Sequence, residues 1–193
     1  MFKSVTKTLL LLLFMTVAAK AQWTNVGPFP DASLLGQAHA LATDPDGKIW
    51  VGNFGTESYA KAPGDTVKGV RLIRVFNPDG TQASFSPIYV WDNGTTKDTL
   101  KGSNTRGMRD DADGNILVVD GNQNMYKFDY KTGKGLAKVA LALGTSPTAP
   151  AVASDGTIFV GPVVPGNPIK MFDKDFNYLG NALEATVGYS RSF

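Results

Sequence analysis

The sequence predicts an all-β protein, a partial β-propeller made of about three four-stranded blades. Two observations lead to this prediction. One phrase, a turn dipeptide ending in glycine followed by a short apolar run, occurs at Gly47, Gly114 and Gly156. The runs are also of strand length and rich in β-branched residues, which favours strands over the helix pairs of other repeat proteins.

Each copy of the phrase predicts the same two strands. The apolar runs are Ile49-Trp50-Val51, Ile116-Leu117-Val118-Val119 and Ile158-Phe159-Val160. The second elements are LIRVFNPDG, MYKFDYKTG and IKMFDKDF. From Gly114 to Gly156 is 42 residues, the length of a propeller blade, whereas the 67 residues from Gly47 to Gly114 require insertions in the first copy. A β-sandwich is the alternative fold.

Residues 1–21 have the features of a secretory signal peptide. Lys3 and Lys7 form a positively charged start, residues 9–19 an apolar core, and Ala19-Lys20-Ala21 a cleavage site of the A-x-A type. An apolar core of eleven residues is too short to cross a bilayer as a helix. We therefore expect a secreted, periplasmic or cell-surface protein without a membrane span after cleavage. An uncleaved anchor is the alternative.

The repeat divides the remaining chain into segments. Residues 22–36 would supply either a ring-closing outer strand or a plain N-terminal extension. Blade 1 is expected at residues 37–105 with loop insertions, blade 2 at 106–147, blade 3 at 148–190, and a truncated fourth blade at 191–193. Propellers close with about four to eight blades. The chain is thus expected to be the N-terminal half of a longer, six-bladed protein, and self-assembly of short arrays is the alternative.

Composition excludes several classes of function. The chain has 19 Lys and Arg against 17 Asp and Glu, but three lysines lie in the leader, so the rest carries a net charge of about −1. This balance predicts no nucleic-acid-binding surface. The absence of cysteine excludes disulfides, thiolate metal sites and Cys-His catalysis, and a single histidine leaves little room for a Ser-His-Asp triad. The sequence also has no nucleophile elbow or phosphate-binding glycine motif.

The repeat predicts where a binding site would lie. Positions eight residues before each turn glycine start the first strands, which line the central channel of a propeller. His39, Arg106 and Thr148 occupy these positions, and Arg191 fits the fourth copy. Residues that follow the second strands would emerge at the same end. The candidate ligand-binding residues are His39, Arg106, Thr148, Arg191, Asn53, Glu57, Tyr59, Asp120 and Asn122.

The insertions of the first copy point to the same end. The segment from Asn53 to Gly69 is expected to be a long loop, and a second insertion before Arg106 contains an Asn-Gly turn signal. Long loops at a channel mouth commonly carry binding residues, and a solvated excursion is the alternative. Asp120 and Asn53 carry oxygen donors of the kind that bind calcium, which makes calcium the candidate cofactor. The DPDG and DADG segments resemble pieces of calcium loops but are better explained as turns.

One longer pattern, D-x-DG-x-I-x-V followed by an I/Y-x-x-F-D element, covers residues 37–193. With it the chain resembles the NHL-repeat and SMP-30 (gluconolactonase-like) group of six-bladed propellers. The resemblance implies the propeller fold, and the sequence as a whole favours a secreted repeat protein that binds a small molecule, glycan or protein at its channel mouth, with no catalysis assigned. In the lactonases of this group a Glu, an Asn and an Asp hold a divalent metal. A calcium-dependent lactone hydrolase is therefore one alternative, and an extracellular sensor or cell-surface structural module is another.

Overall fold

The structure, a computed structural model, describes residue 29, residues 37–102 and residues 104–189. These residues form fifteen β-strands and no helix, which confirms the all-β class. Within the same ranges no helix is long and apolar enough to cross a membrane. The predicted signal peptide, most of the segment 22–36 and the candidate site residue Arg191 lie outside the described residues.

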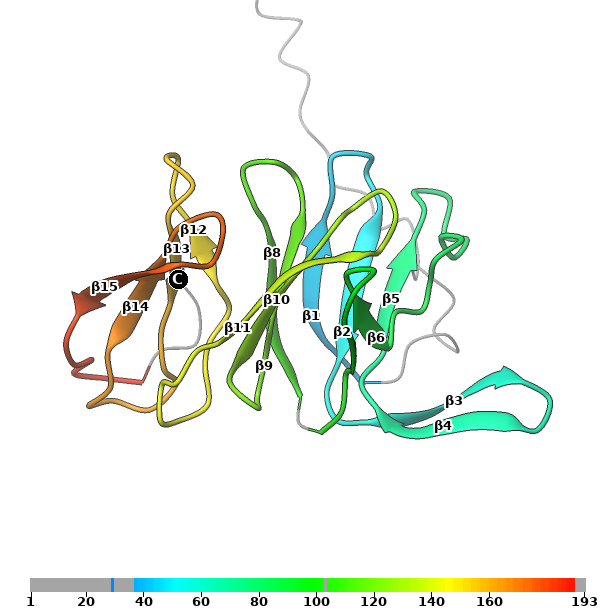
Figure 1. Ribbon diagram of the computed structural model, residues 1–193, viewed down its shortest axis with the longest axis horizontal. Helices are drawn as coiled ribbons and strands as arrows, with labels where there is room; N and C mark the ends of the chain where they lie inside the picture. The colour runs from blue at the N-terminus through cyan, green and yellow to red at the C-terminus, as the bar shows by residue number, and fades with distance from the viewer. Residues whose placement is uncertain (1–28, 30–36, 103, 190–193) are drawn as a thin grey trace, which may run out of the picture.

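Eleven of the strands form three antiparallel sheets that stand side by side (Figure 1). The first sheet contains β1 (Ala38–Thr43), β2 (Ile49–Asn53) and β5 (Ile73–Phe76). The second contains β8 (Thr105–Asp110), β9 (Ile116–Asp120), β10 (Asn124–Phe128) and β11 (Gly135–Ala140). The third contains β12 (Ala151–Val152), β13 (Ile158–Val160), β14 (Ile169–Phe172) and β15 (Tyr178–Leu183). Each sheet is a meander, so strands follow one another in space as they do in the chain, apart from the insertion before β5.

The first sheet has three strands where four were expected. Residues 82–88 run beside β5 but pair with it through isolated bridges only, between Ile73 and Ile88 and between Phe76 and Gln82. The N–H of Val75 donates to the Ser86 hydroxyl at 3.0 Å instead of to a strand partner. This side chain interrupts the ladder, so the segment does not form a regular fourth strand.

The turn between the first two strands of each sheet has the same hydrogen-bond pattern. Asp44, Asp111 and Ala153 each donate their N–H to the carbonyl four residues on and accept the N–H of the turn glycine. The glycines have φ of 77°, 82° and 86°, a region that residues with a β-carbon disfavour. In the first two copies Oδ1 of the aspartate accepts two more backbone N–H groups. The interpretation of these segments as turns is confirmed.

The first insertion is a hairpin of β3 (Glu57–Ala62) and β4 (Asp65–Val70), which extends from the end of the sheets (Figure 1). The prediction of a loop over residues 53–69 is therefore wrong for most of its length. Gly64 closes the turn with φ of 83°, and the β-forming residues Tyr59 and Val67 pair across the strands. Polar and small residues make up most of the hairpin, so the sequence shows no clear alternation of apolar and polar residues that would indicate strands.

The second insertion is the hairpin of β6 (Val90–Asp92) and β7 (Lys97–Thr99). Its turn contains the predicted Asn-Gly pair, with Gly94 at φ of 89° and Asn93 Oδ1 accepting two backbone N–H groups. The Asn-Gly turn signal is confirmed. The hairpin packs against β11, the outer strand of the second sheet, through an ion pair between Asp98 and Lys138.

Two apolar clusters fill the space between the sheets. Ile116 and Val118 of β9 belong to the cluster shared with the first sheet, which includes Trp50. Leu117 and Val119 belong to the cluster shared with the third sheet. Successive side chains of a strand point to opposite faces, so β9 is covered on both sides and all five of its residues are buried. Burying each large apolar side chain contributes roughly 1.5–3 kcal/mol.

Candidate ligand-binding end

The first strands of the three sheets begin at one end of the molecule. Nδ1 of His39, in β1, lies 2.6 Å from the carbonyl oxygen of Thr105, at the start of β8. A β-carbon added to Gly107 of β8 would lie 2.2 Å from Cα of Ala149, which leads into β12. β1 therefore adjoins β8, and β8 adjoins the chain entering β12. The structure thus brings the segments of the predicted residues His39, Arg106 and Thr148 together.

His39 is exposed at this end and is paired with a second ring. It packs against Phe54 with 5.3 Å between ring centroids and 60° between the ring planes. Phe54 is 47% exposed and is fixed by its N–H, which donates to the carbonyl of Gln37 at 2.7 Å. Phe54 was not among the predicted residues, although an aromatic residue directly after a strand at this end is a usable signal. Arg106 is partly buried in β8.

Thr148 lies at the same end but is turned inward. Its side chain is buried, and its hydroxyl lies 3.2 Å from the carbonyl oxygen of Gly161. Its N–H donates to the same carbonyl at 2.8 Å. The polar groups of Thr148 are thus used to join the chain before β12 to the end of β13.

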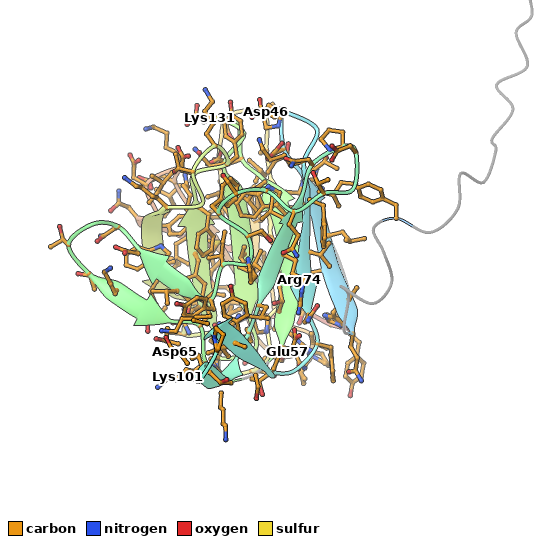
Figure 2. All side chains as sticks on the ribbon, turned by 90° about the vertical axis from the view of Figure 1, so that its right-hand side faces the viewer. Asp46, Glu57, Asp65, Arg74, Lys101 and Lys131 are labelled. Carbon is orange, nitrogen blue, oxygen red and sulfur yellow. The ribbon has the colours of Figure 1, made fainter. Side chains whose placement is uncertain are left out.

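Asn53, Glu57 and Arg74 form a polar chain at the base of the β3–β4 hairpin. The amide of Asn53 donates to Glu57. Both carboxylate oxygens of Glu57 accept from Arg74, at 2.9 and 2.7 Å, so the pair is bidentate (Figure 2). The hydrogen bonds from Arg74 lower the pKa of Glu57, against the opposing effect of partial burial. Tyr59 packs on Tyr89 with 5.3 Å between centroids. These contacts hold the hairpin on the body of the protein.

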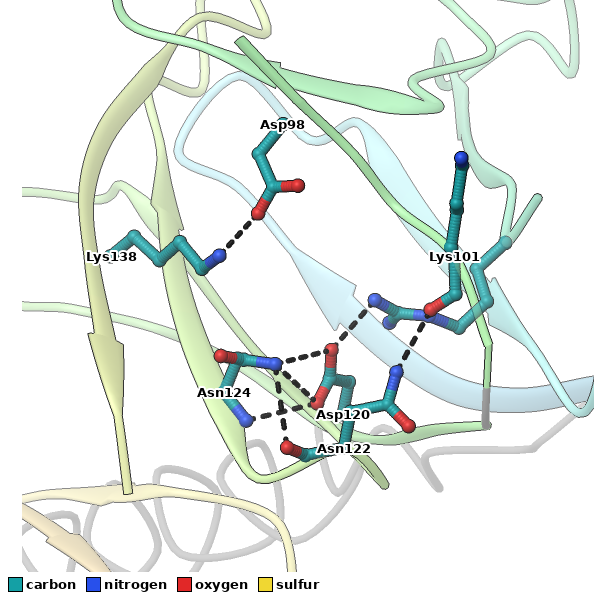
Figure 3. A network of polar contacts seen from close by, with 7 residues as sticks. Asp98, Lys101, Asp120, Asn122, Asn124 and Lys138 are labelled. Carbon is teal, nitrogen blue, oxygen red and sulfur yellow. Dashed lines mark hydrogen bonds and ion pairs between the residues drawn. The ribbon is translucent and has the colours of Figure 1, made fainter. Parts of the chain in front are cut away.

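Asp120 is part of a buried ion pair. Its Oδ2 lies 2.7 Å from Nη2 of Arg71, and neither side chain is exposed. Asp120 Oδ1 accepts the N–H of Asn124 at 2.9 Å. Asn122 is exposed and donates to the carbonyl of Lys101 at 3.0 Å, and Figure 3 shows Asp120, Asn122 and Asn124 gathered beside Lys101. Burial raises the pKa of the neighbouring Tyr126, and the charge of Asp120 adds to this effect.

Of the two candidate calcium ligands, Asp120 already has its carboxylate in an ion pair, whereas Oδ1 of Asn53 has no partner among the described residues. The guanidinium of Arg71 supplies positive charge beside Asp120, and the amide nitrogen of Asn53 is directed to Glu57. Within the part of the chain that the structure describes, no group of three or more His, Asp or Glu side chains is arranged to hold a metal ion. Asp120 therefore fits a structural role better than it fits calcium coordination.

Three buried polar atoms in this region have no hydrogen-bond partner among the described residues. They are Oδ1 of Asn53, Nη1 of Arg71 and Oγ1 of Thr105. Thr105 pairs with Asp120 in register and packs against Gly52, where a β-carbon would lie 2.5 Å from its Cγ2. A buried polar group without a partner costs about 1–3 kcal/mol. Where the first two sheets meet at this end, three buried polar atoms therefore remain able to form further hydrogen bonds.

Comparison with known proteins gives little further information. No protein-family model matches the chain, and no curated protein matches its sequence. Among solved structures, a protein of unknown function from Bacteroides caccae is similar, with a TM-score of 0.46 and 14% sequence identity. The match covers 80% of this chain and 48% of that one, so the chain spans about half the length of that structure.

Proposed function

We propose that the protein is a secreted β-propeller repeat protein that binds a ligand at the end where its first strands begin. The observation that carries this proposal is the adjacency of β1, β8 and the chain entering β12. In a propeller the first strands surround the channel. Equivalent positions of the three repeats would therefore meet at one opening, as their adjacency here supports.

The surface at this end offers suitable groups for recognition. The exposed rings of His39 and Phe54 provide an apolar face, and Arg106 provides a cation in the neighbouring strand. Binding sites typically combine apolar or aromatic surface with a few converging polar groups. A small molecule or a glycan residue with a flat face and a polar substituent fits these groups.

The geometry favours binding without catalysis. Metal-dependent lactone hydrolysis requires a carboxylate that is free to hold the ion, whereas Asp120 is neutralised by Arg71 at 2.7 Å. Export is part of the proposal and is supported by the leader sequence over residues 1–21. N-terminal sequencing of the protein exported from its host tests this part, and the expected first residue is Gln22.

Nuclear magnetic resonance of the ¹⁵N-labelled protein tests the binding site. A panel of monosaccharides, disaccharides and small carboxylic acids is added, and amide shifts are followed. Shifts are expected to cluster at His39, Phe54, Gly55 and Arg106, and the double variant His39→Ala/Phe54→Ala is expected to abolish them. Lys131→Ala, at the opposite end of the molecule (Figure 2), is the matched control. Shifts confined to that opposite end, or unaffected by the double variant, would contradict the proposal.

A further inference from the structure

A second candidate site lies in a cleft of about 460 Å³ between residues 85–97 and the β10–β11 turn. Phe85, Ile88 and Tyr89 provide apolar walls, and Asp92, Lys97 and Lys134 provide charges. The volume falls within the range of small-molecule sites. The cleft does not include His39, Phe54 or Arg106, so an inference about it is independent of the proposed function. Its Tyr89 packs on Tyr59 of the β3–β4 hairpin.

The walls of the cleft are held in place by the surrounding protein. Phe85 packs so closely on Gly133 that a β-carbon there would lie 2.6 Å from its Cδ2. Phe85 also meets Trp50, with 5.8 Å between ring centroids. Asp92 and Lys97 pair across the β6–β7 hairpin and form an ion pair of 2.8 Å. The wall formed by Phe85 therefore needs little reorganisation on binding, which favours affinity.

The charged groups of the cleft have one positive charge in excess. Lys97 is paired with Asp92, and its hydrogen bond lowers the pKa of that carboxyl, with a smaller contribution from the charge of Lys134. Lys134 is exposed, and among the described residues it takes part in no ion pair. The cleft therefore combines apolar walls, a carboxylate that can accept hydrogen bonds, and an ammonium group without a counter-ion.

We propose that this cleft binds an acidic sugar residue, a uronic acid within a polysaccharide. The C–H face of a pyranose ring packs on the negative face of an aromatic ring such as that of Tyr89. The carboxylate of the sugar binds Lys134, and a ring hydroxyl donates to Asp92. An acidic peptide would place a second carboxylate near Asp92 without a hydroxyl to donate to it. The cleft is open to solvent, which suits one or two residues of a longer polymer.

Isothermal titration calorimetry of the full chain with tetragalacturonate at low salt tests this proposal. The neutral galactose tetramer has similar rings without carboxylates and is expected to bind at least about tenfold more weakly, as the loss of a charge-assisted contact predicts. Lys134→Gln is expected to weaken tetragalacturonate binding about tenfold. Lys131→Gln, in the same turn but outside the cleft, is the matched control and is expected to change binding less than about twofold.

Four results would overturn the proposal. They are no binding of tetragalacturonate, equal binding of the neutral tetramer, equal effects of Lys134→Gln and Lys131→Gln, and equally tight binding of poly-glutamate. The variant His39→Ala/Phe54→Ala separates this site from the ligand-binding end, because it is expected to leave tetragalacturonate binding unchanged. Loss of binding in that variant would also overturn the assignment of the sugar to this cleft.

Discussion

Arg71 and Asp120 form an ion pair of 2.7 Å in which neither side chain reaches solvent. The pair joins the chain at the end of β4 to the end of β9, 49 residues further along the sequence. Removing two charges from water is costly, and each charge is tolerated in the interior because the other is present. The pair therefore fixes the base of the hairpin to the second sheet.

Breaking this pair from one side is expected to destabilise the fold strongly. Asp120→Asn leaves the guanidinium of Arg71 buried without a counter-ion, and the free energy of unfolding should fall by about 3–5 kcal/mol in urea titrations. Asp98→Asn breaks the more exposed pair with Lys138 and should cost less than about 1 kcal/mol. Equal losses for the two variants would show that Asp120 is not held in a buried pair.

Gly107→Ala tests the contact between the second and third sheets. The added β-carbon would meet the backbone of Ala149 at 2.2 Å, and backbone cannot move aside as a flexible side chain can. The expected loss is about 1–3 kcal/mol or more, measured by urea unfolding. Gly188→Ala is the control, since a β-carbon there meets nothing within 4 Å, and its effect should stay within about 0.5 kcal/mol. If Gly107→Ala left the free energy of unfolding unchanged, the second and third sheets would have to lie further apart than described.

Ala153→Asp tests whether the three turns are equivalent. Ala153 makes the same backbone hydrogen bonds as Asp44 and Asp111 but lacks the carboxylate that accepts two further N–H groups. The N–H of Thr157 already donates to Asp155 at 2.9 Å, so the substitution should raise the free energy of unfolding by less than about 1 kcal/mol, seen as a higher Tm. Asp111→Ala should lower it by more than this, because Asp111 also lies 2.8 Å from Nζ of Lys127. A lower Tm for Ala153→Asp would contradict the equivalence.

Acid should weaken the attachment of the β3–β4 hairpin. Hydrogen bonds from Arg74 hold the pKa of Glu57 below its ordinary value of 4.5. The carboxylate of Glu57 therefore becomes protonated at a higher pH in the unfolded chain than in the folded one. The stabilisation is therefore complete above the unfolded pKa and is lost as pH falls through the lower folded pKa. Glu57→Gln should flatten the decline of Tm between about pH 5 and pH 3.

The control for this pH series is Glu184→Gln, which removes a carboxylate that accepts from Asn181 at 2.9 Å near the edge of the third sheet. It should leave the acid-side slope close to that of the unaltered protein. If the Tm of Glu57→Gln falls with decreasing pH as steeply as the Tm of Glu184→Gln, the bidentate pair with Arg74 does not contribute to stability.

Local signals in the sequence were sufficient for the repeated turns and strands. The glycines at 47, 114 and 156 are in the left-handed region because of their place in a tight turn, and the apolar runs after them are strands of the three sheets. Both features depend on residues within a few positions of one another. The repeat then placed His39, Arg106 and Thr148 on neighbouring segments, since equivalent residues of adjacent sheets lie at the same end.

Features that depend on distant residues could not be read from the sequence. Arg71 and Asp120 are 49 residues apart in the chain, and Arg71 directly follows the β3–β4 hairpin, an insertion with no counterpart in the other repeats. Phe54 belongs with His39 only because the loop folds back to Gln37. The orientation of Thr148 is likewise set by the carbonyl of Gly161, and its position in the repeat carried no information about burial.

Strand β9 has a further consequence for how the molecule responds to strain. Its side chains enter one apolar cluster at Ile116 and Val118 and the other at Leu117 and Val119. A displacement of the first sheet therefore reaches the third through these four consecutive residues. β9 is part of both apolar clusters, so opening it would disrupt both. Its amide protons should therefore be the slowest in the described chain to exchange with solvent.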